Sequence, residues 1–464
     1  MAKTSTRSKS SASFKCSECG WTTIKWVGRC GECQAWGTVE EVGVVSARTV
    51  AAAKVAHPAK PIAQIDGSEA AFRPSGVSEL DRVLGGGLVP AAAILLAGEP
   101  GVGKSTLLLD VAAKAAQTGL RVLYLTGEES AAQVKSRAER INAIADTLFL
   151  AAETDLALAL GQIQEIDPQL LILDSVQTFS SAEVDGAAGG VSQVREVAAS
   201  IINAAKTRAM STIMVGHVTK EGSVAGPRLL EHLVDVVCQF DGEKHSRLRI
   251  LRALKNRYGA TDEVGCFDLN EDGIESLTDP SKLFVTRTRN PVPGTCITVT
   301  LEGRRPLVAE VQTLLSRSNA PAARRATSGL DAARAQMVVA VLQARAHMDL
   351  SSMDSYIATV GGVKIAEPAS DLACALALAS SMNEFPLPQD FVAFGEVGLA
   401  GEVRQVPEIS RRITEAQRLG FSFAMAPATP EPLKNIPEGI RVFQVENIAQ
   451  ALDIAFNQRQ KPTR

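Results

Sequence analysis

An octapeptide from Gly98 to Ser105 combines the residue types and the spacing needed to hold the phosphates of a nucleotide. It reads Gly-Glu-Pro-Gly-Val-Gly-Lys-Ser, so that Lys104 and a hydroxyl directly follow the last glycine. Glycines let backbone N–H groups turn toward phosphate oxygens, Lys104 can reach the β- and γ-phosphates, and Ser105 can ligate Mg²⁺. The pattern predicts a loop that binds ATP and Mg²⁺, made of Gly98, Glu99, Pro100, Gly101, Val102, Gly103, Lys104, Ser105 and Thr106.

The residues around this loop predict the strand and the helix that must position it. The apolar run Ala91–Ala97 is typical of a buried strand, and a helical pattern opens at Thr106. A helix N-terminus directly behind the loop adds partial positive charge where the phosphates would lie. Strand and helix patterns then alternate, which is typical of a wound α/β domain. The apolar runs concerned are Val122–Leu125, Leu170–Leu173, Ile213–Val215, Val234–Phe240 and Leu248–Leu254.

Acidic residues follow two of these runs. Asp174 ends the run Leu170–Leu173, where a carboxylate can hold the water shell of Mg²⁺ opposite the phosphate loop. Glu128 and Glu129 follow Val122–Leu125, and one of them is a candidate general base that polarises the attacking water. Paired acids at a helix N-terminus are also favoured without any function. We favour Glu128 over Glu129, and the sequence leaves the choice open.

Two further groups of residues are candidates for sensing phosphate or contacting DNA. His217 follows Ile213–Val215 and either senses the γ-phosphate or is an ordinary polar residue. Lys220 and Arg228 lie in a glycine-containing segment after it, which suits contact with a phosphate backbone or is a plain surface loop.

The segment Lys255-Asn-Arg257-Tyr-Gly ends another apolar run with two cations. Cations at this position cannot easily reach the phosphate loop of their own chain. They could act on the ATP of a neighbouring subunit, as arginine fingers do. Contact with DNA and a plain surface role are the two alternatives.

Four of the eight cysteines lie within eighteen residues and form two Cys-x-x-Cys pairs. Two such pairs supply four thiolates for tetrahedral Zn²⁺ and leave no open position for catalysis. The ligands are Cys16, Cys19, Cys30 and Cys33, and the residues between the pairs leave room for a short hairpin at Trp21–Val27. A redox dithiol or two unrelated thiol pairs are the alternatives.

The composition describes a chain of about three domains without a membrane span. It has 464 residues, 45% of them hydrophobic, and a net charge of −3, which does not exclude nucleic acid because binding depends on where cations cluster. No apolar run reaches the ~18 residues of a membrane helix. The segment Met1–Lys15 lacks the apolar core of a secretory signal and loosely resembles a transit peptide. Cytoplasmic localisation is the expectation.

The order of these features closely resembles the bacterial RadA (Sms) family of DNA repair ATPases over nearly the whole chain. The resemblance implies a RecA-like ATPase that uses ATP, Mg²⁺ and Zn²⁺. It also implies a hexameric ring that moves the branches of recombination intermediates along DNA. It also implies single-stranded and branched DNA and the RecA recombinase as partners. By matching position it assigns Asp174 to the Mg²⁺ side and makes Lys255 and Arg257 essential cations. Tyr258 stands where many members have Phe.

The C-terminal third resembles the proteolytic domain of Lon proteases, which use a Ser–Lys dyad. In the matching turn Ala369 stands in place of the nucleophile, with Ser370 one residue late, and Ser410 replaces the lysine. Without nucleophile or base there is no acyl transfer. We therefore expect a scaffold that closes the ring and presents cations to DNA, among them Arg304, Arg305, Arg324 and Arg325.

The predicted fold class is α/β, with a RecA-like ATPase core, an N-terminal zinc knuckle and a C-terminal Lon-protease-like α+β domain. The predicted ranges are 1–41 for the zinc domain, 42–66 for a linker, 67–283 for the ATPase and 284–464 for the last domain. A regulatory ATPase of the circadian-clock type would share the core but would not need the knuckle. A Lon-like ATP-dependent protease would need the dyad.

Overall fold

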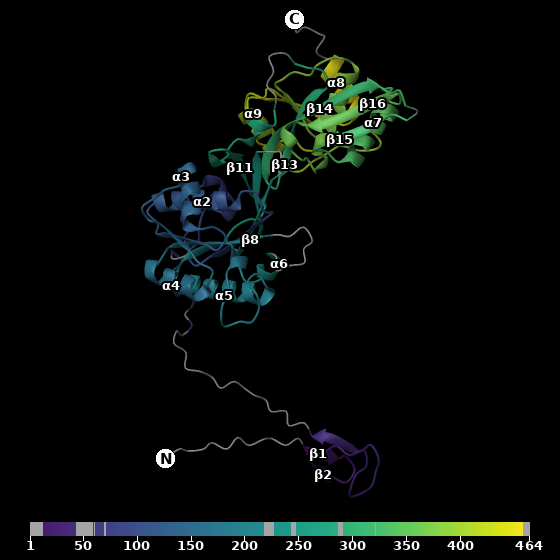
Figure 1. Cartoon of the computed structure of the whole chain (residues 1–464). Helices are drawn as coiled ribbons and strands as arrows, with labels where there is room; N and C mark the ends of the chain where they lie inside the picture. Colours follow the sequence, from purple (N-terminus) through teal and green to yellow (C-terminus); the bar gives the residue numbers. More distant parts are fainter. Residues whose placement is uncertain are drawn as a thin grey trace. The chain divides into compact units, whose positions relative to one another are not determined.

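The computed structural model describes residues 13–42, 59, 61–68, 71–217, 227–242, 247–285, 291–320 and 322–457 (Figure 1). The chain divides into two compact units, Met1–Asp66 and Gly67–Arg464. Most of the predicted linker, and Lys220, lie outside the described residues. Within the described residues, no helix has the length and apolar character needed to cross a membrane.

The first unit contains a small antiparallel sheet in the order β2-β1-β3. Its strands are β1 (Ser13–Cys16), β2 (Thr22–Thr23) and β3 (Val39–Val42), and a short helix η1 (Ile62–Gln64) follows. The hairpin predicted within Trp21–Val27 is wrong, because Thr23 pairs with Phe14 of β1 instead. The strand that leads into the first cysteine pair supplies the partner, so the hairpin spans that pair rather than the segment after it.

The second unit begins with a nine-stranded sheet in the order β12-β11-β10-β9-β4-β8-β7-β5-β6. Strands from β9 to β6 in this order run parallel, whereas β10, β11 and β12 add an antiparallel edge. The strands are β4 (Ala93–Gly98), β5 (Val122–Thr126), β6 (Leu148–Ala152), β7 (Leu170–Asp174), β8 (Ser211–His217), β9 (Val236–Asp241), β10 (Leu248–Asn256), β11 (Val264–Asn270) and β12 (Gly273–Ser276).

Helices cover both faces of this sheet, as the alternating pattern predicted (Figure 1). One hydrophobic core lies under α1 (Ser78–Leu84), α2 (Lys104–Gln117) and α3 (Ala131–Arg140). The other lies under α4 (Leu156–Ile166) and α5 (Val191–Arg208), and a short helix α6 (Pro227–Leu230) precedes β9. Because parallel strands end at the same edge, Gly98, Asp174 and His217 come together there.

A second sheet of seven strands follows, in the order β15-β16-β14-β13-β17-β20-β21. Its strands are β13 (Thr295–Glu302), β14 (Arg305–Arg317), β15 (Arg325–Ser328), β16 (Met353–Thr359), β17 (Phe391–Ala393), β20 (Phe423–Pro427) and β21 (Arg441–Val445). One core contains α7 (Ala332–Arg345), α8 (Asp371–Met382) and α10 (Ile448–Leu452), and another contains α9 (Ile409–Arg418). A separate hairpin pairs β18 (Glu396–Val397) with β19 (Val403–Arg404).

A buried ion pair joins strand β14 of the second sheet to helix α1, which packs on the first sheet. Arg305, at the start of β14, is buried and pairs with Glu79 of α1. Its other guanidinium nitrogen donates to the carbonyl oxygens of Leu277 and Thr278. The expectation that Arg305 faces DNA is therefore wrong, because its guanidinium is buried and paired with the buried carboxylate of Glu79 on helix α1.

Candidate functional site

The phosphate loop lies between β4 and α2, as predicted. Gly98 is the last residue of β4, and Lys104 is the first of α2. Gly103 caps the helix with a φ of 106°, a left-handed conformation that side chains other than glycine rarely adopt. A Cβ at Gly98 would lie only 2.4 Å from the carbonyl oxygen of Phe240, so this position has no room for a side chain. Glycine is thus required on both sides of the loop.

Lys104 is buried, and its ammonium is held inside the loop. Its Nζ donates to the carbonyl oxygens of Gly98 and Glu99 at 2.9 and 3.0 Å. Burial lowers the pKa of Lys104, whereas the negative charges of Asp174 and Glu128 raise it. These carbonyls hold the ammonium where an arriving phosphate can replace them as its partner.

Asp174 ends β7 next to the loop and offers one carboxylate oxygen that lacks a partner. Its Oδ2 accepts a hydrogen bond of 2.6 Å from the hydroxyl of Tyr124 on β5. Its Oδ1 is buried and has no hydrogen-bond partner among the described residues. A buried unpaired carboxylate oxygen is costly unless a cation or its water shell satisfies it, so this site fits Mg²⁺.

Glu128 and Glu129 have different partners. Glu128 Oε1 accepts a 2.6 Å hydrogen bond from the Ser175 hydroxyl and lies 2.7 Å from His217 Nε2. Glu129 instead pairs with Arg137 of α3 at 2.9 Å. Glu128 therefore belongs to the edge of the sheet that carries the phosphate loop, whereas Glu129 is tied to a helix.

The contacts of Glu128 keep it ionised. The hydrogen bond with His217 is the largest cause that lowers the pKa of Glu128, to about 2, and partial burial opposes it. The Ser175 hydroxyl and the charge of Lys104 lower the pKa further. A carboxylate this acidic orients and polarises a water molecule more readily than it removes a proton from it.

Lys255 and Arg257 lie at the opposite ends of the parallel strands from the phosphate loop. Lys255 Nζ donates to the carbonyl oxygens of Glu231 and Val234 at 2.7 and 2.8 Å. Arg257 pairs with Asp235 at 2.8 Å, and its side chain is 53% exposed. Because β10 is antiparallel to β9, and β9 is parallel to β4, both cations lie beside the start of β4, whereas the phosphate loop follows its end.

The three residues at the positions of the Lon dyad are either buried or hydrogen-bonded to the backbone. Ala369 is fully buried, and the Ser370 hydroxyl donates to the carbonyl oxygen of Glu367 at 3.4 Å. The Ser410 hydroxyl donates to the carbonyl oxygen of Lys434 at 2.9 Å. Neither serine contacts a side-chain base in these hydrogen bonds.

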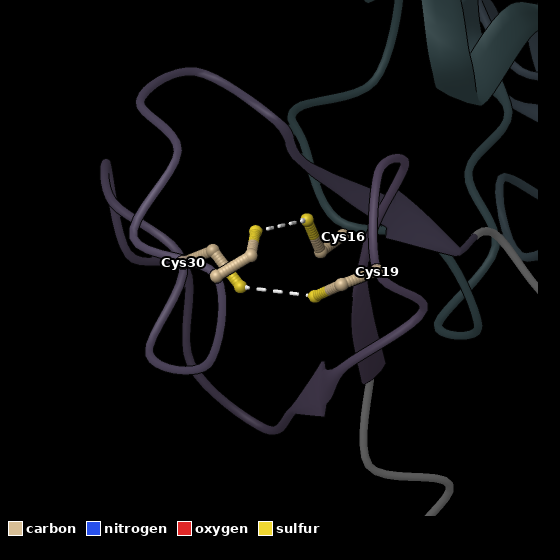
Figure 2. A group of neighbouring side chains, drawn as sticks. Cys16, Cys19 and Cys30 are labelled. Carbon is tan, nitrogen blue, oxygen red and sulfur yellow. Dashed lines mark hydrogen bonds between the residues drawn. The ribbon is translucent and has the colours of Figure 1, made fainter.

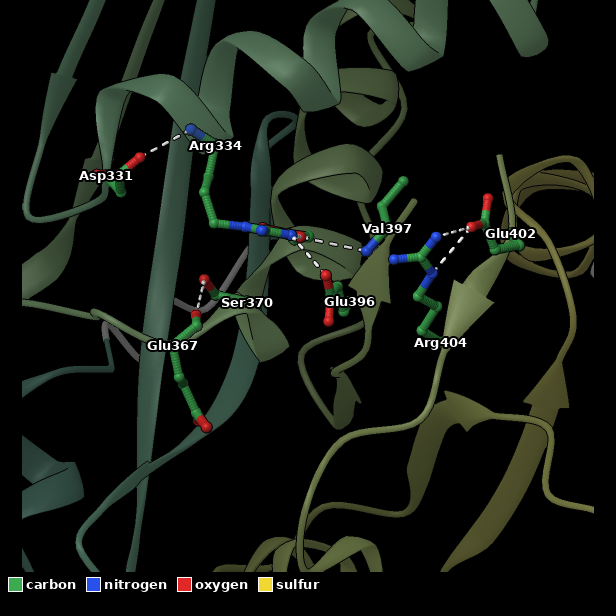
Figure 3. Close-up of polar contacts among 9 residues, drawn as sticks. Asp331, Arg334, Glu367, Ser370, Glu396, Val397, Glu402 and Arg404 are labelled. Atoms are coloured by element: carbon green, nitrogen blue, oxygen red, sulfur yellow. Dashed lines mark hydrogen bonds and ion pairs between the residues drawn. The ribbon is translucent and has the colours of Figure 1, made fainter. Parts of the chain in front are cut away.

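An ion-pair cluster lies beside Ser370 (Figure 3). Arg334 of α7 pairs with Asp371 at the start of α8 and lies 3.4 Å from Glu396. Asp371 also accepts a hydrogen bond of 3.2 Å from the backbone N–H of Val397. Burial raises the pKa of Asp371, and Arg334 opposes that rise. The cluster joins two helices to the β18–β19 hairpin.

The four cysteines form one cluster with the geometry of a zinc site (Figure 2). Their sulfur atoms all lie within 4.8 Å of one another, and none is in a disulfide. The Cys16–Cys33 and Cys19–Cys30 sulfur pairs are 3.7 and 3.5 Å apart. Tetrahedral zinc with bonds of about 2.3 Å places its sulfur ligands about 3.8 Å apart, so the thiols fit Zn²⁺.

We expect Cys30→Ser to remove this metal and to unfold the first unit while the second unit stays folded. The described core around the cysteines is small, with Cys16, Cys30 and Val39 as its buried residues, so the metal supplies most of the folding free energy. Metal analysis of reduced protein should give about one zinc per wild-type chain and almost none in the variant. Cys238→Ser, at a buried thiol outside the cluster, is the control. A zinc-free wild-type chain would contradict this prediction.

Three residues of the site were not singled out by sequence reasoning. Tyr124 counts as one more apolar residue of a strand, and Ser175 is visible only as the neighbour of Asp174. Arg249 of β10 is buried and donates to the carbonyl oxygen of Val102 in the loop at 2.9 Å. Only the register of neighbouring strands brings these side chains to the site.

Comparisons with protein families agree with both the phosphate-loop domain and the cysteine cluster. Residues 59–223 match the model of an AAA domain, and residues 14–41 match that of a rubredoxin metal binding domain. The AAA match spans the phosphate loop, Glu128 and Asp174, and the rubredoxin match spans the four cysteines. The chain is an ATP hydrolase that uses ATP and Mg²⁺, and its zinc ribbon holds Zn²⁺.

Curated relatives cover almost the whole chain. A DNA repair protein RadA of Mycolicibacterium smegmatis is 51% identical and covers 96% of this chain and 97% of the relative. Its namesake in Mycobacterium tuberculosis is 50% identical over 95% of this chain and 92% of the relative, and that of Streptococcus pyogenes is 44% identical over 97% and 100%. This chain belongs to the DNA repair protein RadA family.

Proposed function

We propose that this DNA repair ATPase is a DNA-dependent motor that drives branch migration of recombination intermediates together with the RecA recombinase. It works in the cytoplasm as a ring of six subunits on single-stranded and branched DNA. One observation carries the proposal. The phosphate loop follows the C-terminal end of β4, whereas the exposed cation Arg257 lies beside the N-terminal end of the same strand. A site divided in this way is completed by a second subunit.

Within one chain, three side chains are assigned to ATP hydrolysis. Lys104 leaves the carbonyl oxygens of the loop and neutralises charge on the β- and γ-phosphates. Glu128 orients the water that attacks the γ-phosphorus as the bond to the bridging oxygen breaks, since it is ionised and lies near Lys104. Asp174 would hold the water shell of Mg²⁺ through its unpartnered Oδ1, and the ion would supply charge stabilisation to the phosphates.

Arg257 is assigned to the ATP of the neighbouring subunit. The strand β4 spans Ala93–Gly98, which is about 17 Å of extended chain. Asp235 holds Arg257 and accepts from the backbone N–H of Ala93, so the guanidinium is fixed at the far end of that strand. An arginine side chain is shorter than the length of β4, so Arg257 does not reach the phosphate loop of its own chain. Lys255 orders the turn before β9 and thereby supports Arg257.

Mixing two inactive variants tests this assignment. Arg257→Ala chains should bind ATP through their own intact loop but hydrolyse it at least about tenfold more slowly. Lys104→Ala chains carry an intact Arg257 but a defective loop. Mixed rings contain interfaces with one intact loop facing one intact Arg257, so steady-state ATPase assays of the mixture should show partial recovery.

Subunit exchange must first be demonstrated with labelled chains. Arg247→Ala is the matched control, since Arg247 is also exposed and paired with an acid, Asp268, on the same sheet. It should keep wild-type activity. Proven mixing without recovery would place Arg257 in its own site or on DNA.

We further propose a Lon-protease-like C-terminal domain without peptidase activity, with domain ranges of 1–41, 42–66, 67–283 and 284–464. The buried Ala369 and the backbone-bonded hydroxyls of Ser370 and Ser410 support this. Arg304, Arg324 and Arg325 remain as its candidate cations for DNA. Casein should stay intact in the presence of ATP and the protein.

A branch-migration assay tests the function as a whole. RecA forms joint molecules between circular single-stranded and linear duplex DNA, and the protein is then added with ATP. We expect it to increase the yield of fully exchanged product, and Lys104→Ala to leave the yield at the level of RecA alone. An equal yield with and without the wild-type protein would contradict the proposal.

A further inference from the structure

We infer that Tyr124 is a positioning residue for ATP hydrolysis, which fixes the carboxylate of Asp174 so that one oxygen is kept for the magnesium water shell. The inference rests on the proposed role of Asp174. Tyr124 touches neither phosphate nor water in this account and acts only through Asp174.

The contact is buried and short. Tyr124 is 1% exposed and Asp174 is 3% exposed, and the phenol oxygen lies 2.6 Å from Asp174 Oδ2. The two strands are neighbours, with Thr126 of β5 opposite Asp174 of β7. The ring of Tyr124 belongs to the same core as Leu109 of α2 and Val134 of α3, so packing fixes its direction.

The hydrogen bond makes the two oxygens of Asp174 different. Oδ2 is satisfied by the phenol, whereas Oδ1 is buried without a partner among the described residues. A carboxylate held at one oxygen cannot turn freely about its last bond, so Oδ1 keeps one direction. In this contact the phenol hydroxyl is the donor and Asp174 Oδ2 is the acceptor.

A second interaction pattern supports a dedicated role. Each of the two acids at this edge of the sheet receives one hydroxyl donor, Tyr124 for Asp174 and Ser175 for Glu128. Glu128 has His217 as a further partner. Among the described residues, the Tyr124 hydroxyl is the one side-chain hydrogen-bond partner of Asp174. Loss of the Tyr124 hydroxyl therefore leaves Asp174 without its orienting contact in the described structure.

The test is the magnesium dependence of nucleotide binding by Tyr124→Phe. This change removes the hydroxyl and keeps the ring, so packing in the core is preserved. Affinity for a fluorescent ATP analogue is measured in Mg²⁺ and in EDTA, together with the thermal midpoint and the free Mg²⁺ needed for half-maximal hydrolysis. Tyr356→Phe, on β16 of the other sheet, is the matched control.

We expect Tyr124→Phe to bind the ATP analogue in EDTA with wild-type affinity. The factor by which Mg²⁺ increases this affinity should be about tenfold smaller than in the wild type. The variant should also need more free Mg²⁺ for half-maximal hydrolysis. Tyr356→Phe should match the wild type. An unchanged gain from Mg²⁺ would overturn the inference. Equal losses of affinity in Mg²⁺ and in EDTA, with a lower thermal midpoint, would also overturn it, since they mark a purely structural residue.

Asp174→Asn separates this inference from the proposed function. If that variant loses the gain from Mg²⁺ while Tyr124→Phe keeps it, only the role of Tyr124 fails. If Asp174→Asn keeps the gain, the assignment of Asp174 to Mg²⁺ fails, and the inference about Tyr124 fails with it.

Discussion

Lys104→Ala is expected to lower ATP hydrolysis at least about a hundredfold while the chain stays folded. Among the described residues, the ammonium donates hydrogen bonds to the loop carbonyl oxygens of Gly98 and Glu99, so its loss leaves the sheet and α2 in place. What is lost is the cation that neutralises charge developing on the γ-phosphate. Phosphate release under saturating MgATP measures the effect.

Lys114→Ala is the matched control for this change. Lys114 lies on the same helix, and its ammonium pairs with Asp110 near the surface at 2.8 Å. It should hydrolyse ATP at the wild-type rate with a similar thermal midpoint. Normal turnover by Lys104→Ala would remove the phosphate loop from the mechanism.

Glu128→Gln and Glu129→Gln form a pair of variants that decides between the two acids. Glu128→Gln should lower hydrolysis by about 10² to 10⁴, because the ionised oxygen that orients the attacking water is replaced by a neutral amide. ATP binding should persist. Glu129→Gln should stay within severalfold of the wild type, since Glu129 is paired with Arg137 of α3.

Single-turnover rates with bound ATP separate chemistry from binding in these two variants. Both keep the size of the side chain, so differences in packing do not enter. Faster chemistry in Glu128→Gln than in Glu129→Gln would reverse the assignment of the water-orienting acid.

The phosphate loop was predictable from sequence because its determinants are contiguous. Gly98, Gly103 and Lys104 lie within seven consecutive residues. The strand that ends at Gly98 and the helix that begins at Lys104 are both where the sequence predicts them. The zinc ribbon is similar, since each cysteine pair sets its own local geometry. In both cases chemistry and local structure are encoded by neighbouring residues.

Contacts between distant residues were not predictable in this way. Arg305 follows a glycine and another arginine, which is typical of an exposed turn, yet its partner Glu79 lies 226 residues away. Tyr124 meets Asp174 across 50 residues, through the register of β5 and β7. The register of neighbouring strands cannot be read from a single sequence, so the partners of these residues can be identified only in the folded structure.

The most direct test of the central claim is ATP turnover by the zinc-loaded wild-type chain, measured with Mg²⁺ in the presence and absence of single-stranded DNA. A DNA-dependent ATPase predicts measurable hydrolysis that rises severalfold, by about three or more, when the DNA is added and that requires Mg²⁺. Hydrolysis that is absent, or that is the same with and without DNA, would contradict this account.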